Sequence, residues 1–271
     1  MSTPPPTGPL VTRDSLAAEL RGLGVESGET LLAHSSLSSL GWVNGGAVTV
    51  VQALLDALGP SGTLVVPTQS GDQSDPAVWR APPVPEEWWD RIRATMPPYD
   101  PATTPSRGVG VIPETVRTWP GARRSAHPQT SFAALGPRAA DILDGHSRDC
   151  RLGERSPLAR LERLGARVLL LGAGYDACTS FHLAEYRIPS PLVKVGRPAP
   201  GGGWETVTEV SITSDRFDEL GHDFERDRPV VRGRAGAAEA RLFPVADAVG
   251  YARRWLPVHR PREEEFQHPH V

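Results

Sequence analysis

Cysteine is almost absent from this chain of 271 residues, in which only Cys150 and Cys178 occur. Two cysteines cannot supply the several bridges of a disulfide framework, and such low usage is typical of proteins from a reducing compartment. We therefore expect a cytoplasmic protein whose stability comes from a packed core.

Long apolar runs are also missing, since no run approaches the roughly 20 residues that a membrane-spanning helix requires. Residues 1–9 are rich in Ser, Thr and Pro and lack the apolar centre of a signal peptide, so we expect a disordered leader there. Residues 258–271 are charged and contain proline, and we expect them to form a disordered tail. We therefore expect residues 10–257 to form a single domain.

An excess of positive charge is the third absence. The formal net charge is −3, and Lys194 is the only lysine. Proteins that bind nucleic acids or anionic membranes usually carry a basic excess, so we expect neither partner. The hydrophobic fraction of 39% is ordinary for a globular protein.

The residues that are present alternate between helical and strand patterns. Apolar residues at helical spacing predict helices at 14–23 and 47–58, and short buried runs predict strands at 30–33, 63–67 and 168–171. This alternation predicts an α/β fold with a mixed central sheet and helices on both faces. Weaker patterns predict further helices at 109–118, 137–143, 156–164, 217–224 and 245–255, and strands at 131–135, 204–213 and 236–243.

Residues 69–106 lose this rhythm and contain many prolines, which predicts a long irregular insertion. Its acidic residues include Asp72, Glu86 and Glu87, followed by the aromatic pair Trp88 and Trp89. A solvated face explains such a cluster by default. An acidic, aromatic lid over a polycationic substrate explains it equally well.

The segment T-S-F-H-L-A-E-Y-R (179–187) follows the buried run ending in Leu171 and a glycine-rich turn. We expect Thr179 to cap a helix that places His182 and Glu185 on one face, one turn apart. Such a pair suits a general base with an orienting carboxylate, although an exposed helical ion pair has the same spacing. The Thr179 hydroxyl could instead donate to a developing oxyanion, a role that competes with capping.

Two further segments have the chemistry of a phosphate or amide site. His34, Ser35 and Ser36 end a predicted strand, where open α/β sheets bind ligands. Arg107 precedes Gly108 and Val109 at the start of a predicted helix, which suits a phosphate cradle. Locally bonded polar turns are the alternative in both places.

Taken together, several segments resemble the aminoglycoside 3-N-acetyltransferase family, whose fold is distinct from that of the GNAT acetyltransferases. The matching segments are H-S-S-L-S-S-L-G-W-V-N-G-G (34–46), T-L-V-V-P-T (63–68), T-T-P-S-R-G-V-G-V-I-P-E (103–114), R-S-A-H-P-Q-T-S-F-A-A-L-G (124–136), L-L-L-G-A-G-Y-D-A-C-T-S-F-H-L-A-E-Y-R (169–187) and F-D-E-L-G-H-D-F-E (217–225). They occur in family order and span nearly the whole chain.

The resemblance implies direct transfer of an acetyl group from acetyl-CoA to a primary amine of an aminoglycoside, in antibiotic resistance or self-protection. It implies no metal and a monomer or homodimer. The implied catalytic residues are His182, Glu185 and Thr179. The implied acetyl-CoA-binding residues are His34, Ser35, Ser36, Leu37, Ser38, Arg107, Gly108, Val109 and His127. The acidic candidates for binding the substrate, one of which could replace Glu185, are Asp72, Glu86, Glu87, Asp176 and Glu225.

Three alternatives stay open from the sequence. The same chemistry could act on another small-molecule amine, or the chain could be a catalytically silent CoA-binding protein. A cysteine hydrolase built on Cys178 and Asp176 is the third, although a small buried thiol is the more ordinary interpretation of Cys178.

Overall fold

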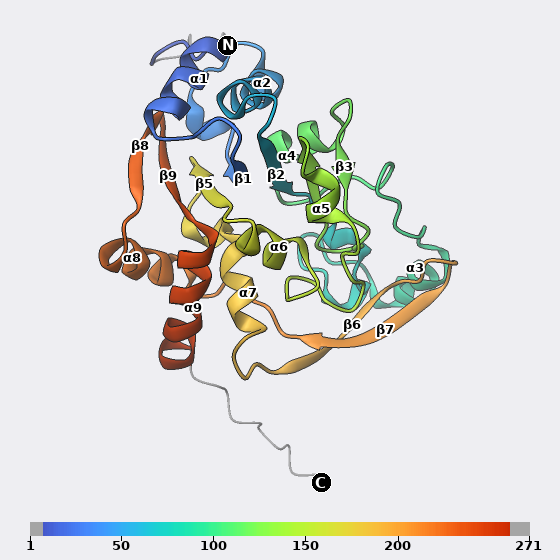
Figure 1. Cartoon of the computed structure of the whole chain (residues 1–271). Helices are drawn as coiled ribbons and strands as arrows, with labels where there is room; N and C mark the ends of the chain where they lie inside the picture. Colours follow the sequence, from blue (N-terminus) through green and yellow to red (C-terminus); the bar gives the residue numbers. More distant parts are fainter. Residues whose placement is uncertain (1–7, 261–271) are drawn as a thin grey trace, which may run out of the picture.

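The computed structural model describes residues 8–260, and its centre is a seven-stranded mixed sheet in the order β3-β4-β2-β1-β5-β9-β8. Strand β1 (Thr30–Ser35) pairs in parallel with β2 (Thr63–Pro67) on one side and β5 (Arg167–Leu171) on the other (Figure 1). The outer strands pair antiparallel. They are β4 (Phe132–Leu135), β3 (Arg123–Arg124), β9 (Ala238–Pro244) and β8 (Val231–Ala235).

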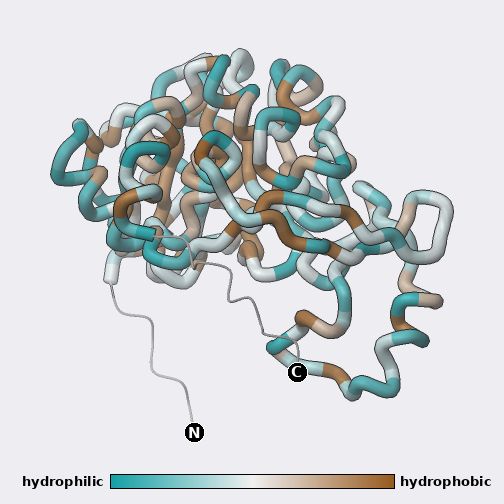
Figure 2. The backbone as a smooth tube through the Cα atoms, turned by 90° about the horizontal axis from the view of Figure 1, so that it is seen from below, coloured by the Kyte–Doolittle hydropathy of each residue, from teal (hydrophilic) through white to brown (hydrophobic). Residues whose placement is uncertain are grey.

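Helices cover both faces of the sheet because alternate strand residues point to opposite sides. Leu31 packs in the core with α1 (Arg13–Gly22), α2 (Gly46–Leu58) and α4 (Val111–Arg117). Leu32 packs in the opposite core. Its helices are α5 (Ala139–Leu143), α6 (Pro157–Arg163), α7 (His182–Glu185), α8 (Phe217–Asp227) and α9 (Val245–His259). Figure 2 shows the hydrophobic segments concentrated inside the molecule. The predicted fold class is confirmed.

A separate two-stranded ribbon projects from this body. Strands β6 (Leu192–Pro198) and β7 (Trp204–Val210) form it, and it reaches toward α3 (Trp89–Thr95) in Figure 1. The prediction of an antiparallel strand within 204–213 is confirmed, whereas β6 and the exposed edge strand β8 were not predicted. Residues 69–106 are not wholly irregular, because they contain α3 and the 3₁₀ turns Gly71–Gln73, Pro76–Val78 and Glu86–Trp88.

Two local predictions at helix ends were wrong. Thr179 does not cap a helix. It begins a 3₁₀ turn, Thr179–Phe181, and its hydroxyl faces His34 instead. Helix α9 continues through His259, beyond the predicted domain end at residue 257, because buried contacts of Trp255 and Leu256 outweigh the missing N–H of Pro257. Residues 1–7 and 261–271, most of the predicted leader and tail, lie outside the described residues.

Candidate active site

The main cavity lies at the edge where the three parallel strands end. Ser35 ends β1, Pro67 ends β2, and Ala173 and Gly174 follow β5, so backbone from three strands meets at one opening. The cavity has a volume of about 920 Å³. The carboxyl ends of parallel strands are where open α/β sheets bind ligands, and residues 34–36, predicted to bind a ligand for this reason, lie there.

His182 lines this cavity from the first residue of α7. Its Nδ1 lies 2.7 Å from Oε2 of Glu185, whose side chain is only 2% exposed. This bond leaves Nε2 as the ring nitrogen available to a bound molecule. The predicted pairing of these two residues is confirmed as geometry, although the helix that carries them has only four residues.

Glu185 is held from its other side by residues that the sequence did not single out. The backbone N–H of Thr213 donates to Oε1 at 3.2 Å, and the guanidinium of Arg260 donates to the same oxygen. Arg260 also donates to the backbone carbonyls of Thr213 and Asp215. The last described residue of the chain therefore reaches the buried carboxylate behind His182. No sequence signal marked it, because it fell in the segment predicted to be disordered.

His34 and Thr179 meet on the same wall of the cavity. Nε2 of His34 lies 3.3 Å from Oγ1 of Thr179. Burial, and then the charge of His182, lowers the pKa of His34 to about 3, so the imidazole is neutral at pH 7. A neutral histidine can accept or donate a hydrogen bond here without placing a positive charge beside His182.

A turn rich in serine follows β1 and lines the cavity beside the start of α2. The Ser36 hydroxyl lies within hydrogen-bonding distance of Ser38 and Ser39. Oγ of Ser35 is buried and has no partner among the described residues. Gly46, the first residue of the 13-residue helix α2, also lines the cavity. The turn therefore presents hydroxyls, and the N-terminus of α2, to whatever the cavity holds.

A second loop, which includes Gly108 and Gly110, also lines the cavity. Gly108 and Gly110 have φ angles of 74° and 87°, which a residue with a side chain rarely adopts. A Cβ added at Gly108 would meet nothing within 4 Å, so this backbone is open to a ligand.

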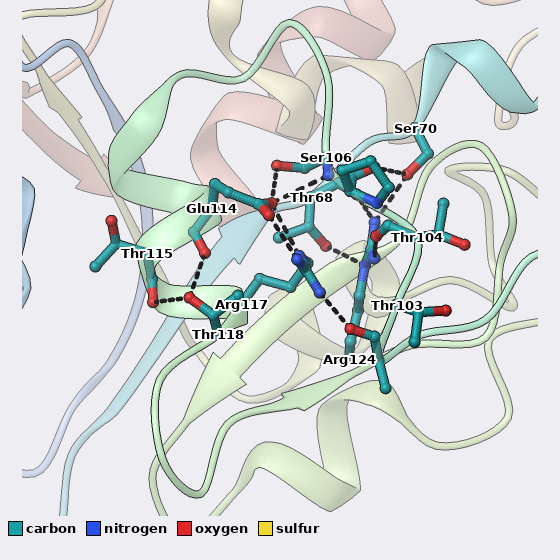
Figure 3. A network of polar contacts seen from close by, with 12 residues as sticks. Thr68, Ser70, Thr103, Thr104, Ser106, Glu114, Thr115, Arg117, Thr118 and Arg124 are labelled. Atoms are coloured by element: carbon teal, nitrogen blue, oxygen red, sulfur yellow. Dashed lines mark hydrogen bonds and ion pairs between the residues drawn. The ribbon is translucent and has the colours of Figure 1, made fainter.

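The network in Figure 3 holds this loop in place. Glu114 accepts from the backbone N–H and hydroxyl of Ser106 and pairs with Arg117. Arg124 donates to the carbonyl of Thr68 and to the hydroxyl of Ser70. Burial raises the pKa of Glu114, but the bonds from Arg117 and Ser106 outweigh it and bring the pKa to about 2. The carboxylate therefore stays charged and ties the loop to α4.

The structure brings most of the predicted residues to this cavity. The lining includes His182 and Thr179 of the catalytic set. It also includes His34, Ser35, Ser36, Leu37, Ser38, Gly108, Val109 and Asp176. Glu185 lies directly behind His182. These side chains come from segments far apart in the sequence, and the convergence of the parallel strands is what assembles them.

Several predicted binding residues lie elsewhere. Arg107 does not line the cavity and pairs with Asp72 at 2.8 Å, with both side chains exposed. Glu86 and Glu87 lie in an exposed 3₁₀ turn away from the lining. These charged side chains stay at the surface because an exposed charge either pairs with a neighbour or stays hydrated.

The other two misplaced residues, His127 and Glu225, are held elsewhere by structural contacts. His127 is fully buried, stacks on His146 with ring centroids 4.8 Å apart, and accepts at Nδ1 from two backbone N–H groups. Glu225 lies on α8 and pairs with Arg232 of β8 and Arg241 of β9, so it does not replace Glu185 beside His182.

Cys178 is fully buried, and burial raises the pKa of its thiol to about 12. A nucleophilic cysteine needs a thiolate near neutral pH. The structure therefore disfavours the cysteine hydrolase considered from the sequence.

Neither a membrane-spanning helix nor a metal site appears in the described part of the chain. No helix within residues 8–260 is both long and apolar enough to cross a bilayer. Over the same range, no group of three or more His, Cys, Asp and Glu side chains is arranged to hold a metal ion.

A fold with its site at the ends of parallel strands, and with a His–Glu pair on the wall, defines an α/β enzyme. The family model described as aminoglycoside 3-N-acetyltransferase matches residues 32–257. The chain belongs to this family of acyltransferases, which confirms the resemblance seen in the sequence.

Individual relatives match nearly the full length. The SPbeta prophage-derived aminoglycoside N(3')-acetyltransferase-like protein YokD of Bacillus subtilis is 46% identical over 250 residues, which cover 90% of this chain and 92% of that protein. Aminoglycoside N(3)-acetyltransferase VIII of Streptomyces fradiae is 37% identical over 267 residues, covering 91% and 92%.

Solved structures agree with these matches. The crystal structure of YokD superposes with a TM-score of 0.91 at 44% identity, covering 94% of this chain and 97% of that one. The binary complex of AAC-IIIb with CoASH superposes with a TM-score of 0.79 at 32% identity, covering 92% and 97%.

Proposed function

We propose that this chain transfers the acetyl group of acetyl-CoA directly to a primary amine of an aminoglycoside, with His182 as general base. The observation that carries the proposal is the His182–Glu185 pair on the wall of a cavity that also presents a hydroxyl-rich turn and an open glycine loop. Relatives named aminoglycoside N(3)-acetyltransferases, a CoASH-bound structure and a sisomicin-bound structure support it.

The chemistry assigns a role to each nitrogen of His182. The amine nitrogen attacks the thioester carbonyl carbon, the C–S bond breaks, and the amine must lose a proton during the step. Nε2 of His182 takes this proton, while Nδ1–H stays bonded to the Glu185 carboxylate. Glu185 holds the ring orientation and stabilises the imidazolium that forms. The thiolate that leaves then recovers a proton, which returns His182 to its neutral state.

Thr179 is the proposed donor to the oxygen of the thioester carbonyl. Its hydroxyl is not used to cap a helix, so the competition expected from the sequence does not arise. A donor that faces developing negative charge in a partly buried site lowers the barrier more than the same donor in water. His34, neutral because its pKa is about 3, holds the hydroxyl in position.

The residues around the cavity fit acetyl-CoA as the second substrate. Ser35 has a buried hydroxyl without a partner among the described residues, which an amide of the pantetheine arm can satisfy. The α2 N-terminus at Gly46 has no acidic residue in its first turn and suits a phosphate. The open backbone at Gly108 allows close approach of the ligand.

The role in resistance or self-protection and the cytoplasmic location are part of the same proposal. Both cysteines are free and buried, which supports a reducing compartment. Oligomeric state, monomer or homodimer, stays a prediction.

The deciding experiment is a turnover screen. Release of CoA from acetyl-CoA is measured with a panel of aminoglycosides, and the acetylated nitrogen is mapped in each product. Acetylation at one fixed ring amine is the expected result. Binding of CoA without turnover of any amine would overturn the proposal and favour a silent CoA-binding protein.

A further inference from the structure

A second cavity lies beside the first, between residues 69–78 and the β6–β7 ribbon. Its volume is about 620 Å³, and Gln69 lines both cavities. The two cavities therefore adjoin at Gln69, and a molecule that presents its amine to His182 and spans this residue would enter the second cavity. No role proposed for the residues of the main cavity uses this second cavity.

The charged side chains on the wall of this second cavity are Asp75, Arg151 and Lys194. Asp75 is paired with Arg93 at 2.7 Å, and Arg151 is paired with the buried Glu209 at 2.7 Å. Lys194 forms no ion pair with any carboxylate among residues 8–260, so its ammonium is the unneutralised charge of the wall. It is also the only lysine of the chain.

The β6–β7 ribbon behind this wall adds further positive charge. Arg148 and Arg197 share Glu205, and Arg197 also pairs with Glu209, so three guanidinium groups face two carboxylates. Burial lowers the pKa of His127 well below its ordinary value, and the neighbouring His146 and then the charges of Arg197, Arg151 and Arg148 lower it further.

Gln129 adds a polar group that needs a partner. It is 8% exposed, and its Nε2 donates to the carbonyls of Gln73 at 3.0 Å and Gly196 at 3.2 Å. These two acceptors set the orientation of the amide. Its Oε1 is buried and has no donor among the described residues, although the residue lines the cavity. A ligand O–H or N–H in this space would satisfy it.

We propose that the second cavity binds an acidic group of the acceptor, so that this chain also acetylates small amines that carry a carboxylate or a phosphate. The proposal rests on the proposed acetyl transfer at His182 and extends its acceptor class beyond polycations. Among the described residues, Asp176 and Asp75 are the carboxylates on the walls of the two cavities, and Asp75 is already paired. Lys194 is therefore the charge of the second cavity that is free to bind an acidic group.

The test compares three amino sugars that differ in one substituent: glucosamine, glucosamine 6-phosphate and muramic acid. CoA release is measured for each, and for an aminoglycoside, with the wild type and with Lys194→Gln and Lys194→Glu. Lys194 is exposed on β6, so neither change disturbs the core. Arg253→Glu, an exposed charge reversal on α9, is the matched control.

We expect the acidic sugars to have kcat/KM values about fivefold above that of glucosamine, the scale of one partly exposed ion pair. Lys194→Glu should remove this advantage and raise kcat/KM for the aminoglycoside, while Arg253→Glu changes neither. A higher kcat/KM for glucosamine 6-phosphate than for muramic acid indicates that the cavity takes a phosphate, and the reverse order indicates a carboxylate.

Two other results overturn the inference in different ways. In the first, glucosamine or the aminoglycoside is acetylated, but the acidic sugars have no higher kcat/KM than glucosamine, or Lys194→Glu leaves the ratio of these kcat/KM values unchanged. The acidic subsite is then refuted, whereas the proposed acetyl transfer stands. If no amine of any kind releases CoA, the proposed function fails and the inference fails with it.

Discussion

Glu185 serves different partners with its two carboxylate oxygens, and this division determines the proposed chemistry at the scale of single residues. Oε2 faces His182, and Oε1 accepts from Thr213 and Arg260. A carboxylate that is 2% exposed must have such partners, because a buried charge without them is costly. The orientation of the imidazole therefore depends on contacts made well away from the cavity.

Replacing His182 with Ala should lower kcat by roughly 10²- to 10⁴-fold, the usual contribution of a positioned general base. The affinity for CoA, measured by calorimetry, should change little. Cys178→Ala is the control, because a thiol whose pKa is about 12 takes no part in the transfer. Near wild-type turnover of His182→Ala at neutral pH would exclude His182 as the base.

Arg260→Gln should lower kcat by roughly tenfold with little change in either KM, because Glu185 loses the cation that neutralises it. Arg260→Lys keeps the charge and should restore part of the lost kcat. An unchanged kcat in Arg260→Gln, together with a lowered free energy of unfolding, would reduce the contact to one of stability alone.

At the scale of elements, the loop before α4 forms one wall of the cavity, and the network of Figure 3 ties it to the sheet. The loop contains glycines at positive φ and has no regular secondary structure of its own. Side-chain bonds from Glu114 and Arg124 supply the order that backbone bonds supply elsewhere. We expect the affinity for acetyl-CoA to depend on this network.

Glu114→Gln should reduce the free energy of unfolding by roughly 1–2 kcal/mol at pH 7 and raise the KM for acetyl-CoA. The pKa of Glu114 falls from an ordinary value of 4.5 to about 2 on folding. Its contribution is therefore fully present above about pH 5 and disappears as the pH falls toward 2. Denaturant unfolding of wild type and variant between pH 3 and 7 measures this difference, which should shrink toward the acid end.

The matched control is Glu219→Gln, which removes a more exposed Glu–Arg pair of the same helical spacing with Arg216. It should leave the free energy of unfolding nearly unchanged at any pH, because solvent screens an exposed ion pair. Equal effects of the two changes across the whole pH range would refute the role given to the Glu114 network.

At the scale of the whole molecule, the distribution of charge decides how substrates approach. The acidic cluster that the sequence suggested as a lid does not face the main cavity, and Asp72 is paired with Arg107. The net charge of −3 is small, so long-range attraction of a polycation is weak.

We accordingly expect the double change Glu86→Gln and Glu87→Gln to leave the KM for an aminoglycoside within about twofold and its dependence on salt unaltered. Initial rates at low and physiological ionic strength test this. A marked rise in KM, with a flatter dependence on salt, would restore the acidic lid proposed from the sequence.

Much of the architecture could be predicted from local pattern, and its failures have physical causes. Runs such as L-V-V and V-L-L-L bury both faces, so they predict central parallel strands. Strand β8 and the ribbon strand β6 carry charged and exposed residues, and their pairing partners determine them more than their composition does. The end of α9 was missed because Pro257 reads as a stop signal, whereas tertiary contacts sustain the helix.

The sequence alone determined the family, the α/β class, the central strands and the His182–Glu185 pair, because each depends on residues close together in the chain or on an ordered set of motifs. Only the tertiary structure decided which acids belong to the site. Glu185 rather than Glu225 faces His182, Arg260 reaches it from the end of α9, and Asp72 turns to Arg107. The physical reason is that a long charged side chain is directed by the partners within its reach, and those partners are set by the packing of distant segments.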